Sequence, residues 1–456
     1  MSEVIIAQDQ GLRGRTIAWS AGQIAVQIYR DVPSLLLLFY MTQVLGISPG
    51  LAGGAIFVPK LIVAVLADLG AGWFSDRLKE TNRRAHLLLL GAVISPPLLV
   101  LLFQAPGDGT EMMRALQVSL VLSAYMIVFS LFSVPHLALG TQISADPGRR
   151  TAAMAWRTAM AAVGLLVAAS VAPILVERFG GGASGYSLMA WILAAICLVT
   201  LLIAWWGSRH IDIRDAARAI PQAAAQATGK AMGRWRALAA NRAALGLLGA
   251  FLCQLCAMGM AYATLAYLFS FNLEFPNPLE TIGIMVLLTS VMAMAMQPIW
   301  VAVSGKIGRR AVYLLGLLGY TFSLCLIAFA PAGNSLWVYV GGVIMGTFQS
   351  ACFTTAFSLL SDVIEHDREI SGESRAGFFS ALFTIIDKVG FALGGTLLVG
   401  LVLEFTGFVA GQPTQSKDAL SGITFGFALL PAFFNVLSMA LLLFVYPREK
   451  PAATVS

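Results

Sequence analysis

The feature that most constrains this chain is a series of about twelve apolar blocks, each close to the length of a membrane-spanning helix. A helix needs about 20 predominantly apolar residues to cross a bilayer. We therefore expect an all-α, polytopic membrane protein with twelve transmembrane helices. The predicted spans are 17–43, 50–73, 86–105, 113–139, 153–176, 186–207, 243–271, 279–304, 311–331, 335–360, 376–404 and 420–446.

The composition supports this prediction and excludes two other classes of protein. Of the 456 residues, 58% are hydrophobic and 11% are charged. Soluble domains have roughly 45–50% apolar and about 25% charged residues. The composition therefore argues against a water-soluble enzyme, and the high apolar content excludes disorder.

Basic residues in the predicted loops indicate how the chain is oriented in the membrane. Lys and Arg gather in alternate loops, on the side that holds both termini, whereas the opposite side has only scattered charges. The positive-inside rule then places both termini on the cytoplasmic side of the membrane. We expect this membrane to be a bacterial-type inner membrane. We attribute the net charge of +6 to this orientation rather than to binding of nucleic acid.

One long polar stretch divides the apolar blocks into two sets of six. Residues 208–242 are rich in Ala and Gln with spaced basic residues, which predicts a cytoplasmic linker that could carry an amphipathic helix. The predicted domains are a six-helix bundle over 1–207, this linker, and a second six-helix bundle over 243–456.

A weak internal repeat supports the division into halves. The segment from Gly72 to Arg84 and the segment 304–310 are both short basic loops between the second and third helices of their half. The first copy resembles the loop signature of the major facilitator superfamily, in which two six-helix halves surround a central site. We expect its conformational residues at Gly72, Asp76, Arg77, Arg83 and Arg84.

Ionisable side chains inside the predicted spans are costly, so each one is a candidate for function. Spans 1, 2, 5 and 11 contain them. They are Arg30, Asp31, Lys60, Asp68, Arg157, Asp387 and Lys388.

The adjacent charges of span 1 are expected to have partners on other helices. Neighbouring residues lie about 100° apart around a helix, so Arg30 and Asp31 should not face each other well. Gln27 is four residues before Asp31 and shares its face. The pattern fits a transport role or a structural ion pair between helices.

The other charged positions leave similar alternatives open. Lys60 could reach the outer surface through its long side chain, whereas Asp68 lies deeper and is too short to do so. His136 fits either a structural role or a proton carrier. Arg157 could set orientation or bind an anionic or hydroxylated solute.

No sequence pattern typical of an enzyme competes with transport. The chain has four His and no H-E-x-x-H, G-x-S-x-G or Walker loop. The five cysteines all lie in apolar blocks, including the pair Cys253 and Cys256, and we expect packing roles rather than a disulfide or zinc site. We therefore expect a non-enzymatic protein without a cofactor.

Four stretches together resemble the glycoside–pentoside–hexuronide:cation symporters, a branch of the same superfamily. They run from Leu38 to Gly46, from Ala67 to Asp76, from Ser133 to His136 with Arg157 further on, and from Ser361 through Ser380 to Gly390. The resemblance covers nearly the whole chain. It implies that Asp68 binds the coupling cation, that Lys388 lies near it, and that Arg157 lies near the sugar.

The chain also departs from that family at positions that matter for the coupling ion. By the resemblance, family aspartates fall at Ala64, Ser133 and Gln27, and the sugar-stacking aromatic falls at Leu137. Sodium prefers several hard oxygen ligands, by analogy with other hard cations. A proton needs only one carboxylate. We therefore favour proton coupling, or a weak sodium site at Asp68, over a full sodium site. The missing acid and aromatic also argue against a galactoside as the solute.

Together these observations predict a monomeric secondary transporter that moves a small organic solute, such as a sugar or glycoside, by alternating access. Asp68, Lys388 and Asp31 are the predicted coupling residues. The rivals are a carrier of lysolipid-like amphiphiles, a polytopic membrane enzyme, and a non-transporting sensor. The predicted substrate-path residues are Gln27, Tyr29, Arg30, Tyr125, Ser133, His136, Arg157, Gln254, Tyr262 and Gln349.

Overall fold

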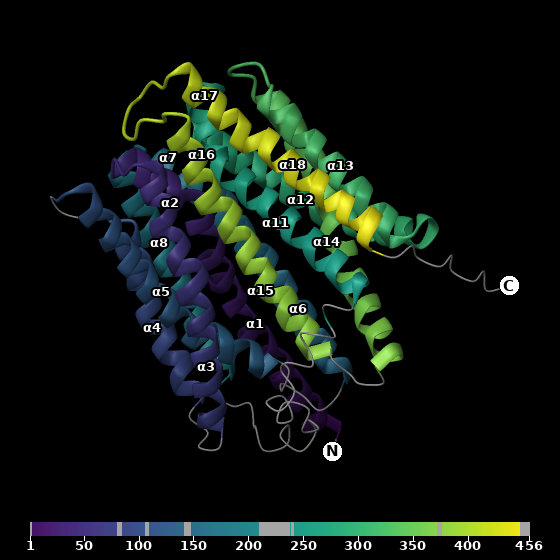
Figure 1. Ribbon diagram of the computed structural model, residues 1–456. Helices are drawn as coiled ribbons and strands as arrows, with labels where there is room; N and C mark the ends of the chain where they lie inside the picture. Colours follow the sequence, from purple (N-terminus) through teal and green to yellow (C-terminus); the bar gives the residue numbers. More distant parts are fainter. Residues whose placement is uncertain are drawn as a thin grey trace. The chain divides into compact units, whose positions relative to one another are not determined.

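The computed structural model describes residues 2–79, 84–104, 109–140, 147–208, 238, 241–371 and 376–446. Within these ranges all regular structure is helical and no strand occurs (Figure 1). The linker predicted over 208–242 lies mostly outside the described residues.

The first half of the chain forms six continuous helical runs, three of which include a π-helical segment. The elements are α1 (Ser2–Phe39) with η1 (Tyr40–Val44), α2 (Pro49–Val58) with η2 (Pro59–Val63) and α3 (Ala64–Lys79), α4 (Arg84–Leu102), α5 (Glu111–Gly140), α6 (Pro147–Leu166) with η3 (Val167–Val171) and α7 (Ala172–Arg178), and α8 (Gly182–Ser208).

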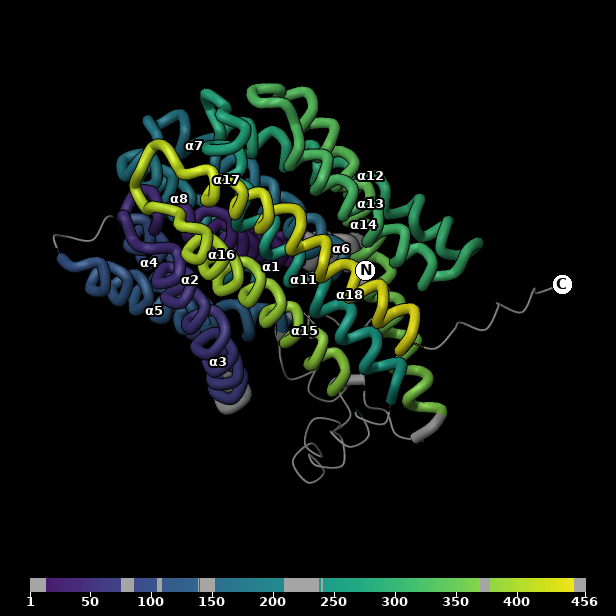
Figure 2. The backbone as a smooth tube through the Cα atoms, turned by 45° about the horizontal axis from the view of Figure 1, so that its top comes forward, coloured from purple at the N-terminus to yellow at the C-terminus, as the bar shows by residue number. Residues whose placement is uncertain are grey.

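The second half repeats this arrangement with another six runs. They are α11 (Arg242–Tyr267) with η4 (Leu268–Asn272), α12 (Pro278–Ile307), α13 (Arg309–Ala328), α14 (Ser335–Ser371), α15 (Ala376–Ala392) with η5 (Leu393–Leu398) and α16 (Val399–Phe405), and α17 (Lys417–Thr424) with η6 (Phe425–Leu429), α18 (Leu430–Ala440) and η7 (Leu441–Val445). Figure 2 shows the last of these as one unbroken helical run.

Eleven of the described helical runs are long and apolar enough to cross a membrane, and His86–Leu102 is a shorter apolar helix at the predicted third span. The prediction of an all-α polytopic fold is confirmed. The largest shift is at the start, because α1 begins at Ser2 while its apolar part is Gly14–Val44. Hydropathy locates the membrane span, whereas the helix itself continues into polar sequence.

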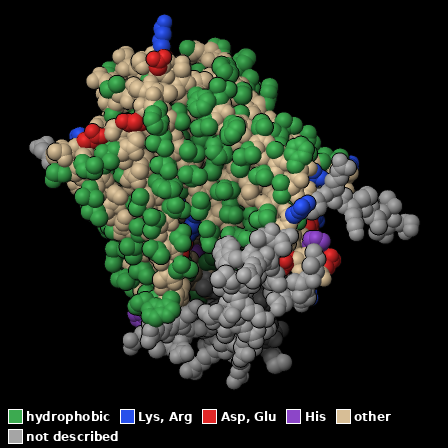
Figure 3. Space-filling model, viewed as in Figure 1, with side chains coloured by type: hydrophobic (Ala, Val, Ile, Leu, Met, Phe, Trp, Pro, Cys, Tyr) green, Lys and Arg blue, Asp and Glu red, His purple; other side chains and the backbone are tan. Residues whose placement is uncertain are grey.

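Apolar side chains cover the described exterior, as a bilayer requires. On the face shown in Figure 3, hydrophobic side chains predominate and charged ones are few. Leu66, Leu69 and Phe405 are 63%, 68% and 86% exposed. Such exposure of large apolar groups would be unfavourable in water and fits contact with lipid.

The chain forms two compact units. Unit 1 comprises Met1–Ile47 and Ala55–Gln226, and unit 2 comprises Ser48–Gly54 and Ala227–Ser456. The three predicted domains with their boundaries at 207 and 243 stay a prediction.

In unit 1, α1 packs closely against α6 and α8 through glycines. A Cβ added at Gly164 of α6 would lie 2.7 Å from both the Ile24 carbonyl oxygen and Gln27 Cβ. A Cβ at Gly207 of α8 would lie 2.6 Å from the Trp19 nitrogen. Small residues let helix backbones approach in this way, and the contact at Gly164 fixes the turn that carries Gln27.

Unit 2 has its own core between α11, α13, α14, α15 and η7. Phe251 and Phe383 stack at its centre, with ring centroids 3.9 Å apart and an interplanar angle of 9°. At η5 a Cβ on Gly394 would lie 2.1 Å from the Cys256 carbonyl oxygen, so α11 contacts η5 backbone to backbone. The two cysteines of the C-x-x-C, Cys253 and Cys256, are free and buried in this packing.

Candidate functional site

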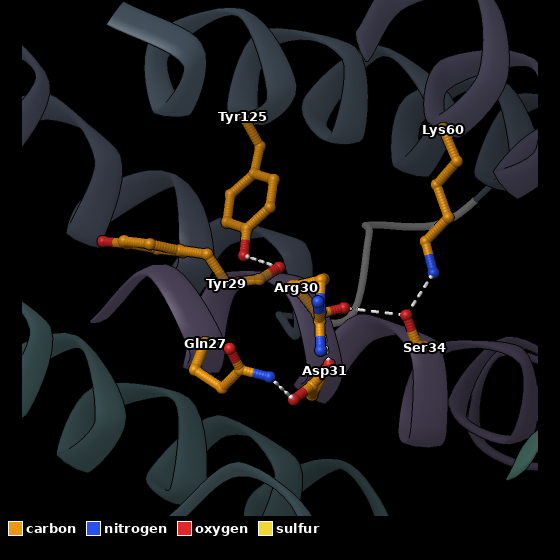
Figure 4. Close-up of polar contacts among 7 residues, drawn as sticks. All are labelled: Gln27, Tyr29, Arg30, Asp31, Ser34, Lys60 and Tyr125. Carbon is orange, nitrogen blue, oxygen red and sulfur yellow. Dashed lines mark hydrogen bonds and ion pairs between the residues drawn. The ribbon is translucent and has the colours of Figure 1, made fainter. Parts of the chain in front are cut away.

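The acid–base pair of span 1 lies on α1 of unit 1 and forms a compact polar cluster (Figure 4). The Gln27 side-chain amide donates to Asp31 Oδ2 over 2.7 Å, which is consistent with their spacing of four residues. Arg30 Nε donates to Asp31 Oδ1 over 2.9 Å. The Asp31 side chain is 12% exposed and the Arg30 side chain 62% exposed.

The expectation that Arg30 and Asp31 cannot face each other is therefore wrong. Their Cβ directions do diverge around the helix. The arginine side chain is long enough, however, to fold back so that Nε reaches the neighbouring carboxylate. Asp31 thus has two side-chain donors from its own helix.

Lys60 joins the cluster from η2, the π-helical segment that begins at Pro59. Its Nζ donates to Ser34 Oγ over 2.9 Å, and Ser34 Oγ in turn donates to the Arg30 carbonyl over 2.7 Å. The side chain is half-buried. Lys60 therefore contacts α1 in this structure.

Tyr29 and Tyr125, the two tyrosines of unit 1 predicted to line the substrate path, are buried. Tyr29 is 1% exposed and Tyr125 is not exposed, and their rings meet edge to face at 5.2 Å. The Tyr125 hydroxyl donates to the Tyr29 carbonyl over 2.8 Å. Ser95 Oγ of α4 donates to the Tyr29 hydroxyl over 3.0 Å. Both hydroxyls thus link α1 to neighbouring helices.

Asp68 lies half-buried on α3, where it accepts a hydrogen bond from Ser130 Oγ of α5 over 2.6 Å. A short bond to a carboxylate oxygen is a strong, charge-assisted one. Among the described residues, no group of three or more His, Cys, Asp or Glu could hold a metal ion.

His136 of α5 is buried between aromatic rings of unit 1. Its ring lies 4.9 Å from the Trp19 ring and 5.1 Å from the Phe132 ring, and Trp19 Nε1 donates to the His136 carbonyl over 3.1 Å. Neither ring nitrogen has a hydrogen-bond partner among the described residues, and the same holds for Nε of Arg157 on α6. Ser133 is half-buried one turn earlier on α5.

In unit 2, Gln254, Tyr262 and Gln349 contact uncharged groups. The Tyr313 hydroxyl donates to Gln254 Oε1, and Gln349 Nε2 contacts Met258 Sδ over 3.4 Å. Tyr262 meets the Phe391 ring edge to face at 5.8 Å.

The acid–base pair of span 11 also belongs to unit 2. Asp387 and Lys388 are half-buried on α15. Like Arg30 and Asp31, they are adjacent residues of opposite charge, but here the acid precedes the base.

The loop motif is only partly described. Gly72, Asp76 and Arg77 lie in α3 and Arg84 begins α4, but the side chains of Asp76, Arg77 and Arg84 are outside the described ones, and Arg83 is outside the described residues. The repeat in unit 2 is described in full, as the tight junction at Gly308 between α12 and α13.

That junction needs glycine and is held by two basic side chains. Gly308 has φ +88°, a conformation that residues with a Cβ rarely adopt. Arg309 pairs with Asp362 of α14, and Arg310 donates to the Leu443 carbonyl over 2.9 Å. The basic loop therefore links three helical runs of unit 2.

Among the unpredicted partners in these contacts are four hydroxyl-bearing residues, namely Ser34, Ser95, Ser130 and Tyr313. Ser34 had a usable signal, because serine inside a helix often donates to the carbonyl four residues earlier. Pro33 was a signal for a different contact, because it leaves the Tyr29 carbonyl without a backbone donor and that carbonyl accepts from Tyr125.

The family described as MFS/sugar transport protein matches this chain over residues 18–450. A protein of Escherichia coli K12 named putative 2,3-dihydroxypropane-1-sulfonate exporter is 25% identical over 433 residues, which cover 93% of this chain and 90% of that protein. The glucuronide carrier protein homolog of the same strain is 24% identical over 447 residues, which cover 96% and 93%.

Among solved structures, a bacterial homologue of the human lysosomal transporter Spinster, inward-facing and unoccupied, has a TM-score of 0.68 to this chain. It is 14% identical and the match covers 97% of this chain and 99% of that one. At this identity the likeness supports the fold alone.

Proposed function

The chain belongs to the MFS/sugar transport protein family and is a secondary active transporter rather than an enzyme, and from that premise we propose that it couples a small hydroxylated solute to a proton. The site in unit 1 carries the proposal, because it holds two carboxylates, Asp68 and Asp31, each bonded to neutral or basic donors.

The proposed coupling residue is Asp68. Sodium, as a hard cation, favours several oxygen ligands, and among the described residues no group of three or more His, Cys, Asp or Glu could hold a metal ion. One carboxylate is sufficient for a proton, which needs one base that gains and loses charge. Lys388, on α15 of unit 2, is proposed as a second coupling residue.

The proposed solute path begins with Gln27, Arg30 and Asp31 of α1 and with Arg157 of α6. Guanidinium and amide groups recognise hydroxyl and acid groups through directed hydrogen bonds. Two relatives are named as a glucuronide carrier homologue and a putative 2,3-dihydroxypropane-1-sulfonate exporter. The compounds in both names carry hydroxyl groups, which supports a hydroxylated solute here. Ser133 and His136 in unit 1 and Gln254, Tyr262 and Gln349 in unit 2 complete the proposed path.

The protein is a multi-pass membrane protein. We further propose that it works as a monomer in a bacterial inner membrane, with both termini in the cytoplasm and no nucleic-acid partner. A reporter fused to either terminus, active only in the cytoplasm, tests the orientation.

Uptake by purified protein in liposomes tests the proposed function. The panel contains a neutral glycoside, a glucuronide, a hydroxylated sulfonate and a lysolipid, each assayed with an imposed proton gradient, a sodium gradient, or neither. We expect accumulation of a hydroxylated solute above its external concentration with the proton gradient. Accumulation only with sodium, or movement of the lysolipid alone, would contradict the proposal.

A further inference from the structure

The backbone of α1 has a defect two residues after Asp31. Pro33 lies inside the helix and has no N–H, so the Tyr29 carbonyl lacks the donor that residue 33 would supply in a regular α-helix. A carbonyl inside a membrane helix needs a substitute donor, since no lipid group can provide one.

Tyr125 supplies that donor from α5. Its hydroxyl lies 2.8 Å from the Tyr29 carbonyl oxygen, and its side chain is fully buried. Because its hydroxyl is bonded to that carbonyl, Tyr125 can fix the backbone turn that carries Asp31. Figure 4 shows Tyr125 reaching α1 from the side opposite Asp31.

The following carbonyl, that of Arg30, also accepts a side-chain hydrogen bond. The Arg30 carbonyl accepts from Ser34 Oγ over 2.7 Å, and Ser34 Oγ accepts from Lys60 over 2.9 Å. Side chains that reach α1 from α5 and η2 thus hold the two peptide groups just before Asp31, Tyr125 directly and Lys60 through Ser34.

We infer that Tyr125 is a positioning residue, whose hydroxyl replaces the missing Pro33 N–H and thereby fixes the direction of the Asp31 carboxylate. The inference rests on the proposed role of Asp31 in the solute path. It also makes a structural statement that holds independently of transport: the hydroxyl is needed because residue 33 is proline.

Thiol labelling at position 31 tests this statement without a known solute. In Asp31→Cys protein in detergent, the rate of reaction with a cationic methanethiosulfonate reports how accessible that position is. The unsubstituted protein measures the background from its five free cysteines. We expect Tyr125→Phe to raise the rate at least threefold, because the turn is released.

Adding Pro33→Ala restores an N–H to the Tyr29 carbonyl and makes the hydroxyl redundant. The variant that combines Asp31→Cys, Pro33→Ala and Tyr125→Phe should have a labelling rate within twofold of that of the variant with only Asp31→Cys and Pro33→Ala. Tyr29→Phe is the matched control, since it removes a buried tyrosine hydroxyl that bonds Ser95 instead of the carbonyl. Pro33→Ala should not reverse its effect.

Thr158→Cys, at an exposed position of α6, controls for misfolding and should label equally in every background. A threefold rise that Pro33→Ala leaves in place, or that it reverses equally for Tyr29→Phe, would overturn the positioning role. If the cycle holds but Asp31→Asn transports like the wild type, the inference stands and the proposed role of Asp31 fails.

Discussion

The two units of this transporter use polar side chains in different ways. In unit 1, charged groups take part beside neutral contacts such as that of Tyr125 with the Tyr29 carbonyl. Asp31, Lys60 and Asp68 are each bonded to neighbours. Among the described residues of unit 2, hydrogen bonds between neutral side chains include Tyr313 with Gln254 and Asn435 with Thr321.

The difference has an energetic meaning. Charged groups inside a membrane are costly and persist mainly where function needs them, whereas neutral hydrogen bonds hold helices together at lower cost. We therefore expect unit 1 to hold most of the coupling chemistry and unit 2 to contribute mainly shape and neutral contacts. Asp387 and Lys388 on α15 are the proposed exception.

The largest expected difference lies between Asp31→Asn and Gln254→Leu. Asn cannot offer a charged acceptor to both Gln27 and Arg30, so we expect uptake of the transported solute to fall at least tenfold, or about 1.4 kcal/mol. Gln254→Leu removes a neutral contact of unit 2 and should lower uptake less. Initial rates in liposomes with equal protein content provide the measurement; a larger loss for Gln254→Leu would reverse the comparison.

Packing substitutions sharpen the contrast between stability and transport. A Cβ at Gly394 would meet the Cys256 carbonyl oxygen at 2.1 Å, so Gly394→Ala should destabilise unit 2 by about 1–3 kcal/mol through overpacking. In Gly164→Ala the new Cβ would lie 2.7 Å from Gln27 Cβ and displace the helical turn that carries Gln27. At an equal loss of stability, this variant should therefore reduce uptake more than Gly394→Ala. Thermal unfolding in detergent and uptake are measured on the same samples. If the loss of uptake relative to the loss of stability were the same for Gly164→Ala and Gly394→Ala, the two units would not differ in this respect.

Tyr313→Phe tests the neutral network of unit 2. It leaves Gln254 Oε1 without the donor seen here, a loss of about 1–3 kcal/mol for a buried acceptor. We expect lower thermal stability with the dependence of uptake on the proton gradient unchanged. An altered gradient dependence would assign coupling to unit 2 as well.

The smallest effect is expected from Ser34→Ala. Ser34 relays Lys60 to the Arg30 carbonyl, and a single hydrogen bond of this kind contributes about 0.5–1.5 kcal/mol. Uptake should fall two- to tenfold, less than with Asp31→Asn. Ser123→Ala is the control, because its hydroxyl bonds only a carbonyl of its own helix among the described contacts.

Hydropathy predicted the fold well because apolar blocks of membrane length are a strong signal. The i, i+4 spacing placed Gln27 and Asp31 on one helix face, although the bond between them was not predicted. The sequence did not predict the bond between Asp68 and Ser130, which lie 62 positions apart. No periodicity links positions on different helices. The pairing of Arg30 with Asp31 was missed because helix geometry gives the direction of Cβ but not where a long side chain ends.

Uphill uptake by Asp68→Asn in liposomes tests the central claim most directly, namely that a carboxylate of unit 1 couples the solute to a proton. We expect this variant to exchange external solute for internal solute but not to accumulate it when a proton gradient is imposed. Accumulation equal to that of the wild type would contradict the coupling role of Asp68.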